Sequence, residues 1–66
     1  MITIKTEDGR FIDVPHDLFY KLGEAYYATD LSTEQVMAIS GLDSESEANW
    51  DLFWDCIDAY RVEHEL

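Results

Sequence analysis

Apolar and polar side chains alternate along the N-terminal segment, on both sides of the pair Asp8-Gly9. Such alternation predicts two strands, and Asp-Gly between them predicts a hairpin. A two-residue loop would pair Ile4 with Asp13 and mix the two faces. A three-residue loop that ends in a left-handed Gly9 pairs Ile4 with Ile12 and gathers the apolar side chains, so we predict this register. One face then carries Ile2, Ile4, Ile12 and Val14, and the other carries Thr3, Lys5, Phe11 and Asp13.

The next segment, residues 16–28, changes to the 3.6-residue period of an amphipathic helix. Pro15 precedes it and suits a helix start, because the first turn does not need the missing N–H group. Gly23 lies inside this helix and is expected to weaken it by roughly 1 kcal/mol. Tyr20 and Tyr27 share a second face. The apolar face carries Leu18, Phe19, Leu22, Ala25 and Tyr26.

A second, shorter helix follows, and both of its ends carry clear signals. Ser32 is the expected N-cap, and Gln35 three residues later completes a capping box. Gly41 is the expected C′ residue, where the left-handed conformation ends a helix. The sequence therefore predicts a helix of about two turns between these residues.

A third and longer helix is predicted to end at about Glu63. Asp43 or Ser44 is the expected N-cap, and Ser44 with Glu47 forms a second possible capping box. Because two strands alone are unstable, the hairpin must pack against the helices. The sequence thus predicts an α+β fold of order ββααα, as a single compact acidic domain over residues 1–66.

The third helix has two contrasting faces. At 100° per residue, one arc collects the apolar side chains and the opposite arc collects acids. Trp54 borders the acids, and Trp50 lies at the edge of the apolar arc. The apolar arc carries Leu52, Phe53, Cys56, Ile57 and Tyr60. The acids, which we name the acidic row, are Glu47, Asp51, Asp55 and Asp58.

The charge of the chain limits its partners. The net charge is −11 over 66 residues, and residues 30–66 alone hold ten acids against one base. Nucleic acid and anionic membranes are therefore poor direct partners, whereas a basic protein surface is a natural one. The single cysteine, the lack of a signal peptide and the lack of a run of about 20 apolar residues predict a cytoplasmic protein.

Two interpretations of the acidic row remain open. An ordinary solvated helix face is the simpler one, but such faces usually mix both signs of charge, and no lysine follows Lys21. The other interpretation is mimicry of a nucleic-acid backbone, because residues four apart place carboxylates about 6 Å apart along a helix. Trp54 would then anchor the interface. Tyr20 and Tyr27 either pack on the third helix or form a second contact patch.

The length, charge, hairpin-plus-helices layout and acidic row resemble the small acidic inhibitors encoded by phages and mobile elements, such as anti-CRISPR and anti-restriction DNA mimics. These inhibitors share no motif, so no residue role is transferred. The resemblance implies a protein of the bacterial host cytoplasm that blocks the DNA or RNA site of a basic nucleic-acid-binding defence complex. An immunity protein or antitoxin that neutralises a basic toxin is the alternative. The expected partner-binding residues are Glu47, Asp51, Asp55, Asp58, Trp54, Glu45, Asp43, Tyr20 and Tyr27.

No motif in the sequence indicates an enzyme. Cys56 is expected to be a buried apolar side chain, because a catalytic thiol needs a nearby base and the chain offers only His16 and His64. There is no phosphate-binding glycine loop, nucleophile elbow or zinc motif. We therefore expect no catalytic residue, no metal and no cofactor. The oligomeric state is left open.

Overall fold

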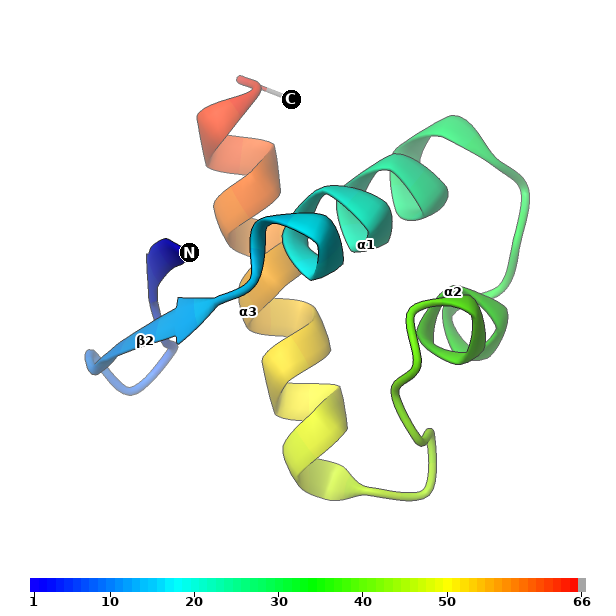
Figure 1. Ribbon diagram of the computed structural model, residues 1–66, viewed down its shortest axis with the longest axis horizontal. Helices are drawn as coiled ribbons and strands as arrows, with labels where there is room; N and C mark the ends of the chain where they lie inside the picture. The colour runs from blue at the N-terminus through cyan, green and yellow to red at the C-terminus, as the bar shows by residue number, and fades with distance from the viewer. Residues whose placement is uncertain (66) are drawn as a thin grey trace.

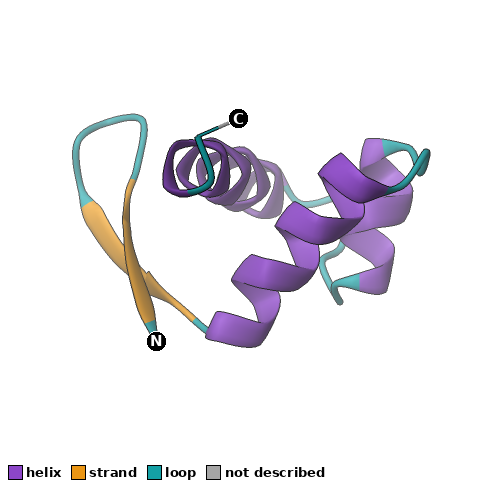
Figure 2. Ribbon diagram, turned by 90° about the horizontal axis from the view of Figure 1, so that it is seen from above, coloured by secondary structure: helices purple, strands orange, loops and turns teal. Residues whose placement is uncertain are grey.

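The computed structural model describes residues 1–65 and has the α+β arrangement ββααα. In Figure 1, α1 crosses α3, with the hairpin on one side of α3 and α2 on the other. Figure 2 shows the hairpin beside α3, which is seen along its axis. Within residues 1–65, no helix is both long enough and apolar enough to cross a membrane. The elements are β1 (Ile2–Lys5), β2 (Phe11–Val14), α1 (His16–Ala28), α2 (Thr33–Ile39) and α3 (Glu47–Glu63).

The predicted hairpin register is confirmed. Ile4 lies opposite Ile12, and the antiparallel pairing continues from Ile2 to Lys5. Gly9 has a φ of 88°, as a left-handed loop residue requires. The loop is closed by two backbone hydrogen bonds: Thr6 N donates to the Arg10 carbonyl at 2.7 Å, and Gly9 N donates to the Thr6 carbonyl at 3.1 Å.

Both predicted ends of α2 are confirmed. Ser32 Oγ accepts a hydrogen bond from Gln35 N, and the Gln35 side chain accepts one from Ser32 N, which completes the capping box. Gly41 has a φ of 79°. Leu42 N donates to the Met37 carbonyl at 2.9 Å and Gly41 N to the Ala38 carbonyl at 3.1 Å, the two bonds of a Schellman motif.

The predicted start of α3 is wrong, although its end at Glu63 is confirmed. The N-cap is Ser46, whose hydroxyl accepts a hydrogen bond from Asn49 N. Asp43 instead accepts a hydrogen bond from Glu45 N at 2.9 Å, and this stabilises a turn before the helix. The Trp50 indole donates to the Ser44 carbonyl at 2.6 Å. These two contacts keep residues 43–45 out of the helix.

The core lies where the three helices and the inner face of the hairpin meet. Gly23 of α1 is buried, and a Cβ atom built there would overlap the ring of Tyr60. The helix-weakening glycine therefore makes room for an aromatic ring of α3. The predicted apolar face of α1 is confirmed, with Leu18 and Tyr26 half-buried at its margins. The buried apolar residues are Ile4, Val14, Phe19, Leu22, Ala25, Val36, Met37, Phe53, Cys56, Ile57 and Tyr60.

Candidate functional site

The acidic row lies along α3 on the side away from its buried face. Glu47, Asp51 and Asp58 are exposed, and Asp55 is half-buried. Successive carboxylates of the row are separated by about 5–6 Å of helix rise, so the row spans about 16 Å. The structure thus presents all four predicted acids from one helix.

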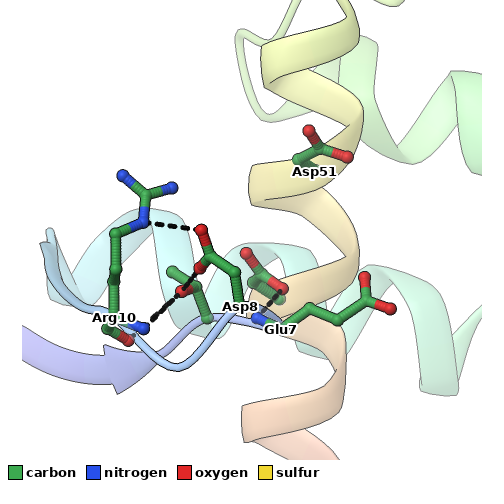
Figure 3. A pocket seen from close by; sticks show the side chains of 6 residues that line it. Glu7, Asp8, Arg10 and Asp51 are labelled. Atoms are coloured by element: carbon green, nitrogen blue, oxygen red, sulfur yellow. Dashed lines mark hydrogen bonds and ion pairs between the residues drawn. The ribbon is translucent and has the colours of Figure 1, made fainter.

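The half-burial of Asp55 comes from the hairpin. Glu7 N donates a hydrogen bond to Asp55 Oδ1 at 3.2 Å, which ties the hairpin loop to the middle of α3. Figure 3 shows Glu7 and Asp8 of the loop next to α3, below Asp51 in this view, with Asp8 directed toward Arg10. An open cleft of about 240 Å³ lies between the loop and α3. Its lining residues are Thr6, Glu7, Asp8, Arg10, Asp51 and Asp55.

Glu7 and Asp8 were missed as site residues by sequence reasoning, which assigned them only to a turn. They are 48 and 47 positions before Asp55, and no periodic pattern connects a hairpin loop with a particular turn of a distant helix. The only available signal was the requirement that a two-stranded hairpin pack against a helix. The acidic surface therefore comes from two elements.

Two ion pairs reduce the negative charge at the margins of this surface. Arg10 Nε lies 2.8 Å from Asp8 Oδ2, and a Thr6 hydroxyl hydrogen bond together with Arg10 lowers the pKa of Asp8. Arg61 lies 3.7 Å from Asp58 at i,i+3, with both side chains exposed. Within residues 1–65 these are the only ion pairs, so Glu47, Asp51 and Asp55 have no basic partner there.

Trp54 lies beside the acidic row and is held in place by other aromatic rings. Its side chain is 42% exposed. The ring packs edge-on against Phe53 at 4.9 Å and against Tyr26 at 6.0 Å between centroids. An exposed tryptophan with a packed base is a suitable interface anchor, because little side-chain freedom is left to lose on binding.

Tyr20 and Tyr27 both pack against the ring of Tyr60 on α3. Tyr27 stacks on the Tyr60 ring at 5.8 Å, and Tyr20 meets it edge-on at 6.3 Å. Tyr20 is half-buried and donates a hydrogen bond to Glu63 Oε1 at 3.0 Å, which raises the pKa of the Tyr20 phenol. Tyr27 is 40% exposed and also contacts Tyr26, the neighbour of Trp54. Tyr27 is therefore the tyrosine that extends the surface around Trp54.

Asp43 and Glu45 lie in the turn that precedes α3. Both are exposed, and they lead along the chain to Glu47 at the start of the acidic row. The side chain of Asp43 already accepts a hydrogen bond from Glu45 N, and its carbonyl accepts one from the Asn49 side chain at 3.2 Å. These bonds fix the turn, so Asp43 and Glu45 extend the acidic surface at the N-terminal end of α3.

The Cys56 thiol is enclosed in the core. Cys56 is fully buried, and burial raises the pKa of its thiol to about 11, with a smaller effect from the charge of Asp55. At neutral pH the side chain is a protonated thiol, which is a poor nucleophile. Within residues 1–65, no group of three or more His, Cys, Asp or Glu side chains is arranged to hold a metal ion.

Comparison of the chain with protein-family models, with curated proteins and with solved structures found no match.

Proposed function

We propose that this protein is a non-enzymatic inhibitor that acts in the cytoplasm of a bacterial host. It binds the basic nucleic-acid-binding groove of a defence nuclease or CRISPR-type effector and blocks the binding of DNA or RNA by charge mimicry. The observation that carries this proposal is the acidic surface of two elements: the acidic row of α3 with Glu7 and Asp8 of the hairpin loop beside it.

The dimensions of this surface suit a groove that holds nucleic acid. The acidic row spans about 16 Å, the axial length of about five base pairs at 3.4 Å each. A Lys/Arg groove that binds phosphates can bind these carboxylates through the same charge-assisted hydrogen bonds. Since Glu47, Asp51 and Asp55 have no basic partner within residues 1–65, their charges are available to such a groove.

Trp54 adds an apolar contact to this electrostatic one. Opposite charges accelerate the encounter of two proteins, whereas a buried aromatic anchor mainly slows dissociation. Trp54→Ala should therefore leave the association rate of the complex nearly unchanged and raise its dissociation rate. Tyr26→Phe is a suitable control, because it keeps the ring that supports Trp54 and removes only a hydroxyl group.

The decisive experiment is competition with labelled DNA or RNA on purified defence nucleases and CRISPR-type effectors. We expect the wild-type protein to displace the nucleic acid from its target, and to do so less well as salt concentration rises. The triple variant Asp51→Asn, Asp55→Asn, Asp58→Asn should lose this competition. The matched control removes three exposed acids outside α3, through Glu24→Gln, Asp30→Asn and Glu34→Gln, and should retain it.

Two results would reject charge mimicry. Equal loss of competition in the triple variant and in its control would show that only the net charge matters. A complex that forms on a target still holding its nucleic acid would exclude occupation of the groove. Neutralisation of a basic toxin without any effect on nucleic-acid binding would instead support the immunity-protein or antitoxin alternative.

A further inference from the structure

The edge of β1 that faces away from β2 carries backbone groups without a strand partner. Thr6 N donates to the Arg10 carbonyl, and bonded positions alternate with non-bonded positions along an antiparallel strand. Counting back by two residues, Ile4 is bonded to β2, whereas the N–H and C=O groups of Thr3 and Lys5 point outward. Within the described part of the chain, β1 pairs only with β2. An edge of this kind is a template for one more strand.

A groove runs along β1 beside the C-terminal half of α3. Its volume is about 410 Å³, which lies within the range of ligand-binding clefts, roughly 300–1,000 Å³. Its apolar wall includes Val62, which lies in the last turn of α3 and is 73% exposed. Asp58 and Glu63 lie among the same lining residues. The full lining is Ile2, Thr3, Ile4, Lys5, Phe19, Asp58, Ala59, Val62 and Glu63.

The charge of the molecule decides between possible occupants. A second copy would bring two net charges of −11 together, which opposes self-association along this edge. A segment that alternates apolar residues with Lys or Arg suits both the groove and the charge around it. Alternate side chains of a strand point to opposite faces, so its apolar residues would face α3 and contact Val62 and Ala59. Its Lys or Arg residues would face the other side, where the net charge of −11 favours them. Addition of a strand supplies backbone hydrogen bonds, and alternate side chains supply selectivity.

We infer that the open edge of β1 and this groove bind an extended segment of a partner protein, in which apolar residues alternate with Lys or Arg, as a third strand of the sheet. This site does not depend on the proposed function. The acidic row and the groove along β1 share Asp58, whereas Asp51 and Glu47 of the acidic row lie outside the groove.

The test uses the wild-type protein and a labelled heptapeptide, Lys-Val-Lys-Val-Lys-Val-Lys, with binding measured by fluorescence anisotropy. Only alternate residues of an added strand direct their N–H groups at the neighbouring edge. Two further peptides carry N-methyl groups, one on the valines and the other on the three last lysines. We expect one methylated peptide to bind at least about tenfold more weakly and the other to bind within about twofold of the parent.

Protein variants then locate the site. Val62→Arg should weaken binding of the parent peptide at least about tenfold, since it removes an apolar wall and repels lysine. Val62 is exposed, so the fold is not at risk. Ala48→Arg makes the same charge change at an exposed site at the other end of α3 and should bind as the wild type does. Asp51→Asn should also leave peptide binding unchanged, which separates this site from the acidic row.

Four results would overturn the inference. The first is that the parent peptide does not bind at millimolar concentration, and the second is that both methylated peptides bind more weakly than the parent to the same extent. The third is that the Val62→Arg variant binds the parent peptide as tightly as the wild type does. The fourth is that Val62→Arg and Ala48→Arg weaken peptide binding equally. Sedimentation that reveals a dimer, which the peptide dissociates, would assign the groove to a second copy of this chain instead.

Discussion

The two faces of α3 follow different physical rules. The inner face buries Phe53, Cys56, Ile57 and Tyr60 in the core that α3 shares with α1 and β1. The outer face presents the acidic row, where like charges at i,i+4 repel one another by a few tenths of a kcal/mol per pair. The inner face is what folding requires. The outer face costs stability instead of adding to it, and this contrast is the reason for the binding role proposed above.

The largest expected effect breaks the inner face. Phe53 is fully buried and contacts the rings of Tyr26, Trp50 and Trp54. Phe53→Ala should lower the free energy of unfolding by about 3–5 kcal/mol through lost burial and an internal cavity. A domain of this size has a total stability of only several kcal/mol, so the variant should be largely unfolded. Thermal denaturation followed by circular dichroism measures this, and an unchanged melt would show that Phe53 does not belong to the core.

Gly23→Ala tests the contact of the inner face with α1. Helix propensity alone predicts a gain of roughly 1 kcal/mol, but the new methyl group would overlap the Tyr60 ring. Overpacking of this kind costs about 1–3 kcal/mol, so the free energy of unfolding should fall. In a Tyr60→Ala background the overlap is absent, and Gly23→Ala should then be stabilising; because this truncation also opens a large cavity, all four proteins are measured in a stabilising osmolyte. Urea denaturation of the four proteins checks this change of sign, and the same sign in both backgrounds would contradict it.

Asp55 belongs to the acidic outer face of α3, but it also holds the hairpin loop through a hydrogen bond from Glu7 N. Asp55→Ala removes the acceptor for Glu7 N and should lower the free energy of unfolding by about 1 kcal/mol. Asp55→Asn keeps an oxygen acceptor and loses a charge, so it should be neutral or slightly stabilising. Hydrogen exchange of the Glu7 amide should become faster in the alanine variant only. Equal exchange in both variants would mean that Asp55 does not hold the hairpin loop.

The smallest expected effect concerns Asp51, which has acids four residues away on both sides. Asp51→Asn removes repulsion with Glu47 and Asp55 and should raise the free energy of unfolding by about 0.5 kcal/mol at low salt. The gain should shrink as salt screens the charges of the wild type. Paired denaturation curves at low and high salt measure it. A loss of stability at low salt would show that Asp51 makes a favourable contact in the free protein.

Much of the fold could be predicted because local rules determine it. The hairpin register followed from the apolar face and Gly9, and α2 followed from Ser32, Gln35 and Gly41. The start of α3 could not be predicted in the same way. Asp43 and Ser44 are reasonable caps by local rules, and the choice of Ser46 also depends on a Trp50 hydrogen bond to the turn.

The candidate site was predictable only in part. Helical periodicity correctly placed the acidic row and Trp54 together on α3. It did not predict that the hairpin loop would half-bury Asp55 and add Glu7 and Asp8, because that contact joins residues 48 positions apart. The sequence also indicated Gly23 only as a residue that weakens its helix, since the Tyr60 ring that occupies the space beside it comes from a different helix.

The two tryptophans of α3 give the protein two separate optical reporters. Trp50 is half-buried and its indole is hydrogen-bonded to the Ser44 carbonyl, so its emission follows the integrity of the fold. Trp54 is 42% exposed beside the acidic row, so its emission follows what covers that surface. Trp50→Phe leaves Trp54 as the only tryptophan, and a shift of its emission to shorter wavelength then marks the arrival of a partner without any added label.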